Sequence, residues 1–158
     1  MRRREKEIQN RQVVEELLHN APVCRIGLAP GTGGTDGNGY PYVLPVHFVY
    51  SEGRILIHTA REGRKIDMMR KNPELCVEID EYLGLTPAEK ACGYGSRYRS
   101  LIAFGRAKFV EAEEEKRRAL QMLMEKYTGR SFDFSAGDVE TVGIIEIELD
   151  EITGKQGV

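Results

Sequence analysis

Polar and cationic residues gather where a predicted strand runs into a predicted helix. The apolar run 55–57 is short and rich in β-branched residues, which is typical of a strand. Apolar positions then recur at helical spacing over residues 64–71. The connection and the first helical turn carry Thr59, Arg64 and Lys65. We therefore expect these three side chains to surround the start of a helix.

The start of a helix is suited to binding an anion. Its first backbone amides are unpaired, and the helix dipole makes it positive. In that setting Arg64 can supply a two-pronged guanidinium, Lys65 a point charge and Thr59 a hydroxyl, which together would bind a phosphate monoester. The same residues would also suit the basic, solvated start of an ordinary helix. The spacing leaves both interpretations open.

Two histidines are predicted to share one face of a hairpin. A two-residue turn at 52–53 would place His47 opposite His58, and the same register pairs Phe48 with Ile57 and Val46 with Thr59. An imidazole titrates near neutrality, so both histidines are candidate catalytic residues that exchange protons. A metal site would need a further ligand in register, and we predict none. Lining a ligand or packing in the core are the other roles open to them.

The composition fits a single domain over residues 1–158, with residues 1–9 as a loosely held, charged lead-in. The 23 basic and 25 acidic side chains give a net charge of −2, which offers no reason to expect nucleic acid binding. Three cysteines without metal-type spacing favour free thiols in a reducing, cytoplasmic compartment. No apolar run approaches membrane-spanning length, so we expect no membrane insertion.

The hydrophobic pattern predicts an antiparallel sheet with flanking helices. The predicted helices are residues 10–20, 64–71 and 112–127, and the predicted strands are residues 23–28, 42–50, 55–57, 74–80, 98–110 and 141–149. Pro45 cannot donate to a ladder and so predicts an edge or a bulge, and Gly105 predicts a bulge or a sharp coil. Hairpins join most strands, so we expect the sheet to curl into a small barrel.

Two long connections are rich in glycine. Residues 29–41 contain five glycines, but a strand follows instead of the helix that a phosphate-binding loop requires. We interpret this segment as a flexible hairpin loop. Residues 81–97 are too long for a tight turn, and either a lid or a wandering loop would fit them.

Four segments, in this order and spacing, resemble the pyridoxamine 5′-phosphate oxidase-like flavin-binding split barrels, and within them the nitroimidazole-resistance flavoproteins. The segments are PYVLPVHFVY, GRILIHTAREGRKIDMMRKNPELCVEID, YRSLIAFGRAKFVE and ITGK. The resemblance implies an antiparallel split β-barrel that forms a homodimer and binds flavin mononucleotide (FMN) at the subunit interface. It covers the chain from about residue 22 to its end.

The resemblance also implies a set of FMN-binding residues. The pairs His58-Thr59 and Arg64-Lys65 match residues that hold the phosphate in the oxidases. The strand that lines the edge of the flavin ring matches Leu44, Pro45, Val46, His47 and Phe48. Ser100, beside Arg99, matches a residue of the partner subunit that is a glutamine in the oxidases, so this contact departs from the family pattern. The sequence also ends without the Arg-Leu segment that grips pyridoxal phosphate, so we do not expect vitamin B6 synthesis.

These features lead to an expected function with two alternatives. The first expectation is an FMN-dependent oxidoreductase that acts on a small electron-poor substrate such as a nitroaromatic, with His58 and His47 as proton donors or acceptors. The alternative is a non-catalytic flavin or haem carrier or sensor, in which one of the histidines could be an axial ligand. A third is a structural dimerisation module whose anion site is unused.

Overall fold

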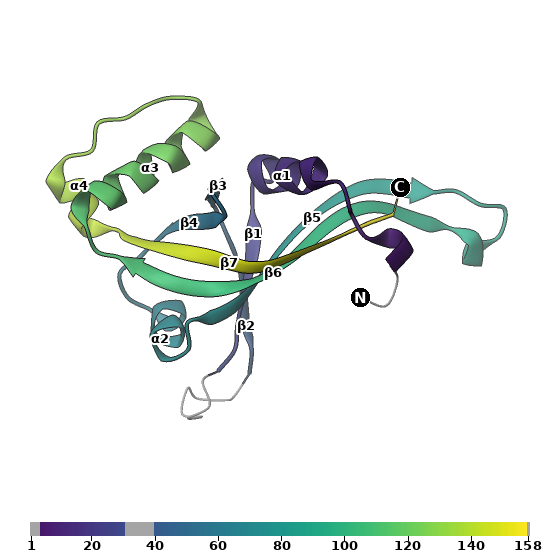
Figure 1. Cartoon of the computed structure of the whole chain (residues 1–158), viewed down its shortest axis with the longest axis horizontal. Coiled ribbons are helices and arrows are strands. Elements are labelled where there is room, and N and C mark those ends of the chain that lie inside the picture. Colours follow the sequence, from purple (N-terminus) through teal and green to yellow (C-terminus); the bar gives the residue numbers. More distant parts are fainter. Residues whose placement is uncertain (1–3, 31–39, 158) are drawn as a thin grey trace.

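The computed structural model describes residues 4–30 and 40–157. Most of the predicted glycine-rich loop, residues 31–39, therefore lies outside the described residues. Seven strands form one sheet, with four α-helices packed around it in the described part of the chain (Figure 1). Within this part, no helix combines the length and the apolar character needed to cross a bilayer.

The strands and helices follow the predicted order. The helical elements are η1 Arg4–Lys6, α1 Arg11–Asn20, α2 Arg64–Lys71, η2 Ala91–Gly93, α3 Glu113–Thr128 and α4 Ala136–Thr141. The strands are β1 Cys24–Leu28, β2 Tyr42–Val46, β3 Val49–Ser51, β4 Arg54–Thr59, β5 Glu74–Thr86, β6 Gly95–Val110 and β7 Gly143–Gly157. Their spatial order is β2-β1-β5-β6-β7-β4-β3, and every pairing is antiparallel. The antiparallel sheet with flanking helices confirms the predicted fold class, and the sheet is open and does not close on itself.

Alternating apolar residues on the inner face of the sheet build the main core. Ile57, Val77 and Ile145 are almost fully buried there, together with Leu18 of α1 and Met69 of α2. A smaller cluster joins α3 and α4 to the ends of β6 and β7. The α1 and α2 helices thus close the main core, while α3 and α4 cover a separate apolar patch.

The predicted strand 42–50 is in fact two strands that lie at opposite ends of the sheet. The predicted hairpin register is confirmed where β3 pairs with β4, for example Val49 with Leu56. The ladder stops there, because β2 pairs with β1 instead and places Val46 beside Cys24. The predicted ladder pairs of Val46, His47 and Phe48 with β4 were therefore wrong. Pro45 lies in the edge strand β2, as its missing N–H requires.

The segment 81–97 was expected to be a lid or a loop, and that prediction was wrong. The β5–β6 ladder continues through Tyr82 and Tyr98 to Thr86 and Gly95, with one bulge next to Gly84. The strand β7 also continues past the predicted end at residue 149 to Gly157. We call residues 80–100 and 152–157 the arm, which projects away from the body of the molecule (Figure 1).

Gly105 marks the point where the arm leaves the body. The register of β6 and β7 shifts between Phe104 and Gly105, which confirms the predicted bulge. A Cβ atom at Gly105 would lie 2.1 Å from the carbonyl oxygen of Glu148, so only glycine fits this close approach of two backbones.

The last residues of the predicted N-terminal lead-in are held in place at Glu7 and Ile8. Ile8 is 7% exposed and joins the main core. Its backbone N–H donates to the carbonyl of Gly154 at 3.0 Å, and Glu7 bridges to Lys155. An apolar side chain in a charged segment therefore anchors the lead-in to the arm.

Candidate functional site

The junction between β4 and α2 is built as a sharp turn that ends on a glycine. Gly63 precedes the helix with φ of 120°, a conformation that side chains other than glycine rarely adopt. Its carbonyl accepts from the N–H of Ile66 at 2.9 Å and of Asp67 at 3.1 Å. No side chain caps the N-terminus of α2 at Gly63. The first turn therefore begins with its positive end uncapped by the chain.

Thr59 brings a buried hydroxyl to this junction. The residue is 7% exposed, and its Oγ1 has no hydrogen-bond partner among the described residues. A buried hydroxyl without a partner costs about 1–3 kcal/mol. Thr59 lines a small cavity together with Arg61 and Ile66 of the junction. An unpaired hydroxyl next to this cationic junction is what a site for a phosphate group would contain, so the donor set fits such a group.

The two cations of the first helical turn differ in their surroundings. Arg64 is exposed, and its guanidinium carbon lies 4.7 Å from the centre of the Tyr42 ring in β2. Lys65 is half-buried. The contact with Tyr42 brings the start of α2 against the edge strand β2, so the predicted phosphate residues and the predicted ring-lining strand are neighbours in space.

The structure brings His47 and His58 near one another although they do not pair in a ladder. Partial burial lowers the pKa of His58, and the positive charges of His47 and Lys65 lower it further. His58 is consequently biased toward the neutral imidazole at neutral pH. That form can accept a proton at one nitrogen and donate one from the other.

A tyrosine of α3 completes this part of the site, and sequence reasoning missed it. The ring of Tyr127 lies 4.6 Å from that of His47 at an interplanar angle of 33°. Its hydroxyl accepts from the backbone N–H of Phe48 at 2.8 Å. The sequence placed Tyr127 in the apolar stripe of its helix and carried no signal for this contact.

The neighbouring Lys126 is half-buried, but its ammonium nitrogen is shielded from solvent. Its Nζ lies 3.7 Å from the centre of the Phe48 ring and has no hydrogen-bond partner among the described residues. Burial lowers its pKa to about 8. Burial likewise raises the pKa of the nearby Cys24 thiol to about 12, so that thiol stays protonated and inert.

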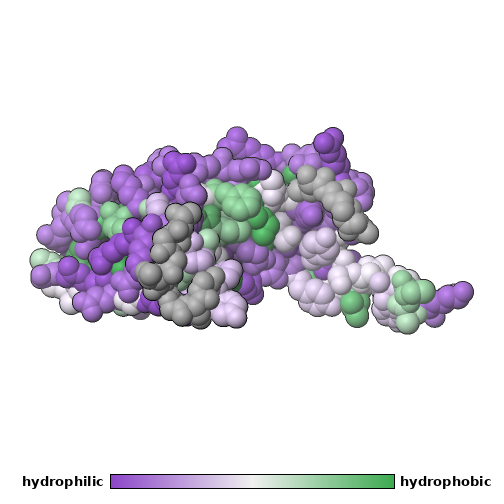
Figure 2. Space-filling view, turned by 90° about the horizontal axis from the view of Figure 1, so that it is seen from below, coloured by the Kyte–Doolittle hydropathy of each residue, from purple (hydrophilic) through white to green (hydrophobic). Residues whose placement is uncertain are grey.

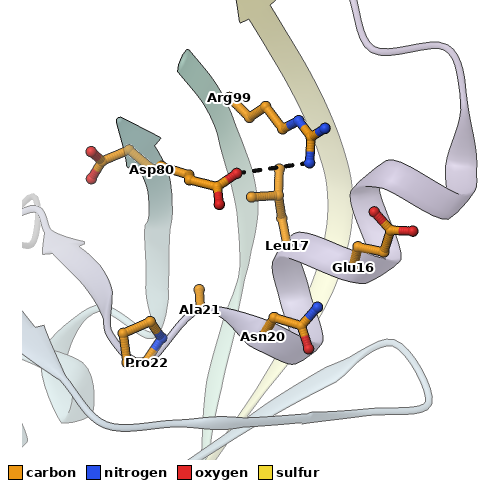
Figure 3. A pocket seen from close by; sticks show the side chains of 8 residues that line it. Glu16, Leu17, Asn20, Ala21, Pro22, Asp80 and Arg99 are labelled. Carbon is orange, nitrogen blue, oxygen red and sulfur yellow. Dashed lines mark ion pairs between the residues drawn. The ribbon is translucent and has the colours of Figure 1, made fainter. Parts of the chain in front are cut away.

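Arg99 and Ser100 lie apart from this group, on the arm. His58 pairs with Ile144 of β7 and Ser100 with Lys155 of the same strand, eleven residues further on, which is roughly 35 Å at the rise of a strand. The Arg99 guanidinium pairs with Glu81 at 3.8 Å (Figure 3). Within one chain, therefore, the structure does not bring Arg99 and Ser100 to the β4–α2 junction.

Arg99 lines a separate cavity of about 170 Å³ between α1 and the arm (Figure 3). Three carboxylates and one guanidinium line it, so it is net negative: Glu16, Asp80, Glu81 and Arg99. Among residues 4–30 and 40–157, no group of three or more His, Cys, Asp or Glu side chains is arranged to hold a metal ion.

Comparison with known proteins identifies the family. The family model for pyridoxamine 5′-phosphate oxidase matches residues 10–156, so the chain belongs to this family, as its sequence segments indicated. A protein of Bacteroides thetaiotaomicron assigned to 5-nitroimidazole antibiotic resistance is 32% identical, with a TM-score of 0.80, over 94% of this chain and 85% of that one.

Two further structures share the fold at lower identity. A flavocytochrome of Azotobacter vinelandii is 20% identical, with a TM-score of 0.84, over 100% of this chain and 72% of that one. An FAD- and haem-binding protein of Mycobacterium smegmatis is 18% identical, with a TM-score of 0.83, over 96% of this chain and 73% of that one. The comparison with curated protein sequences gives no significant match.

Proposed function

We propose that this protein binds FMN, with the phosphate held at the β4–α2 junction by Thr59, Arg64, Lys65 and the first amides of α2. The observation that carries the proposal is the buried hydroxyl of Thr59, which has no partner among the described residues. A phosphate oxygen would satisfy it, and the uncapped start of α2 adds a favourable dipole. His58 lies on the opposite face of β4 from Thr59. It is near His47 and Lys65 and would line the side of the site that faces the flavin ring.

The edge strand β2 and the residues after it would line the flavin ring. Pro45 lies in this strand and is exposed, and His47 is exposed in the break that follows. Because β2 pairs only with β1, its other edge leaves backbone amides and carbonyls available for the polar side of a flavin. The residues that would line the ring are Leu44, Pro45, Val46, His47 and Phe48.

We further propose a homodimer in which the arm of one copy reaches the flavin of the other. Arg99 and Ser100 are too distant from the β4–α2 junction of their own chain to share its ligand. The arm also exposes large side chains with apolar surface, among them Tyr82 at 65% and Leu85 at 54%. The projecting end of the molecule carries hydrophobic residues among polar ones (Figure 2). Covering such surface on a second copy would stabilise the pair.

The proposed activity is that of an oxidoreductase acting on small electron-poor substrates such as nitroaromatics. A bound flavin supplies the transfer of electrons or hydride. The chain supplies anchorage, orientation and an imidazole at His58, whose lowered pKa keeps it neutral at pH 7 and therefore able to accept a proton or to donate a hydrogen bond. Three free cysteines suit a reducing compartment, and we propose a cytoplasmic location.

An absorbance scan of the purified protein tests the cofactor. The yellow bands of a flavin are expected, whereas a Soret band would favour the alternative of a haem-binding carrier. Turnover with a nicotinamide donor and a nitroimidazole would then separate an enzyme from a flavin carrier.

Paired titrations with FMN and riboflavin test the phosphate site. The double variant Arg64→Gln and Lys65→Gln should lose about 100-fold to 1000-fold in FMN affinity, because two charge-assisted contacts disappear. Riboflavin, which has no phosphate, should bind as before. A control variant with Arg117→Gln and Arg118→Gln removes the same charge from α3. Equal losses for FMN and riboflavin would refute the assignment.

A further inference from the structure

The break between β2 and β3 leaves a backbone problem that one side chain solves. Phe48 is 0% exposed and lies outside both strands, so its N–H and C=O cannot use a ladder. Buried backbone groups without partners are strongly destabilising. The hydroxyl of Tyr127, 79 residues further along the chain, accepts from the Phe48 N–H at 2.8 Å and lies 3.0 Å from the Phe48 carbonyl.

The same hydroxyl also reaches a third backbone group. It lies 2.8 Å from the carbonyl of Pro22, so its single proton is donated to Pro22 or to Phe48 while it continues to accept from the Phe48 N–H. These contacts tie the end of α3 to the segment before β1 and to the break. The break is therefore fixed in position by a hydroxyl group in place of a neighbouring strand.

The ring of Tyr127 contacts His47, the residue that precedes Phe48. It packs against the imidazole of His47 at 4.6 Å between ring centres. The charged and titratable groups that face Tyr127 are Lys126, 5.6 Å from its ring centre, and the buried Cys24. One residue of α3 thus holds the backbone of Phe48 with its hydroxyl and the side chain of His47 with its ring.

We propose that Tyr127 is a positioning residue of the flavin site, which fixes the His47 imidazole and the Phe48 backbone at the edge of the bound ring. This inference rests on the proposed function, since it assigns Tyr127 to that site. Tyr127 acts through His47 and Phe48 and needs no contact of its own with the flavin. It also holds His47 close enough to influence His58.

Two variants separate the two contacts of Tyr127. Tyr127→Phe keeps the ring against His47 and removes the hydrogen bonds to Phe48 and Pro22. Tyr127→Leu removes both the ring contact and the hydrogen bonds. The control is Tyr50→Phe, which changes a second tyrosine next to a histidine, because the Tyr50 ring lies 5.2 Å from that of His19.

The first measurement is an NMR titration of the three histidines in the flavin-free protein. Tyr127→Leu should shift the His47 ring signals and raise the pKa of His58, because a displaced His47 no longer adds positive charge beside it. His19 serves as an internal reference, and its ring signals should be unchanged in the two Tyr127 variants. Tyr50→Phe should leave His47 and His58 unaffected. Wild-type signals for His47 and His58 in both Tyr127 variants would overturn the proposal.

The second measurement is flavin affinity. Tyr127→Phe should weaken FMN and riboflavin by the same factor, about tenfold, because the lost hydrogen bonds support the ring side of the site and not the phosphate side. Unchanged affinity for both flavins would also overturn the proposal. A wild-type protein that binds no flavin would contradict the proposed function, while the histidine titrations would still decide whether Tyr127 positions His47.

Discussion

The arm and the β2–β3 break solve the same backbone problem in opposite ways. Within the arm, β6 pairs with β5 throughout and, from Tyr98 onward, also with β7 on its other side. In the break, Phe48 has no strand beside it, and the hydroxyl of Tyr127 takes that place. Ladder pairing satisfies the backbone groups of the arm, whereas the backbone of Phe48 depends on one side chain, and the free backbone groups beside the break are those on the open edge of β2.

The two regions also differ in the partners of their positively charged side chains. On the arm and at its base, Arg25 pairs with Glu78 and Asp80, and Arg99 pairs with Glu81, so these two cations have carboxylate partners. Near the break, Lys126 lies on an aromatic ring instead. Charges without carboxylate partners raise the free energy of the folded chain, and we expect that cost to be recovered when a ligand binds.

The largest expected effect comes from filling the space between the two backbones that approach closely at Gly105, near the base of the arm. Gly105→Val should lower the free energy of unfolding by about 3 kcal/mol or more, because its Cβ would collide with the Glu148 carbonyl. Thermal unfolding measures this loss. Gly137→Ala in α4 is the control, since the nearest atom to its Cβ is the Ser135 Oγ at 3.8 Å. Similar stability of the two variants would show that the arm tolerates a rearranged ladder.

Lys126 is the cation near the break that has no hydrogen-bond partner among the described residues, and replacing it should stabilise the protein, in contrast to the substitution at Gly105. Lys126→Met should raise the free energy of unfolding at pH 7 by about 1–2 kcal/mol, a figure that allows for solvent screening of a half-buried group. The folded pKa of about 8 lies below the ordinary 10.5, so the cost of the charge is complete below pH 8 and disappears as the pH rises to 10.5. Denaturant unfolding at several pH values measures it. An advantage of the variant that does not shrink with pH would contradict this account.

Removal of the unpaired Thr59 hydroxyl at the β4–α2 junction should have a smaller effect on stability, and it should stabilise the protein while weakening FMN binding. Thr59→Val should stabilise the flavin-free protein by about 1 kcal/mol, because it removes a buried hydroxyl without a partner. The same variant should bind FMN more weakly. Thr128→Val is the control with the opposite sign, since its hydroxyl donates to the Met124 carbonyl at 2.7 Å. Loss of stability in both variants would indicate that Thr59 already has a partner.

The smallest expected effect concerns His58. Lys65→Gln should raise the pKa of His58, because one of the positive charges that lower it is removed. NMR titration measures the change, with His19 as the reference. Because the folded pKa of His58 lies below its ordinary value, protonation of His58 destabilises the fold at acid pH, and the variant should lose less stability there. An unchanged His58 pKa would show that the charge of Lys65 does not act on His58.

Much of the fold followed from local patterns. The cap of α1 by Asn10, the end of α3 at Gly129, the edge position of Pro45 and the bulge at Gly105 are each fixed by one residue and its neighbours. The arm was missed because residues 81–86 carry no inward-facing apolar alternation. Its strands are held by pairing with each other and not by a core, so the periodicity of the sequence gives no signal for them.

The sequence by itself determined an antiparallel sheet with flanking helices and a cationic strand-to-helix junction, because hydrophobic period, capping and turn residues act over a few positions. The split barrel followed from the resemblance to a family. Only the tertiary structure decided that strand 42–50 divides between two edges of the sheet, and that Tyr127 and Lys126 close over Phe48. Those contacts join residues 79 and 78 positions apart, where packing and the pairing of buried polar groups decide the outcome and local propensity does not.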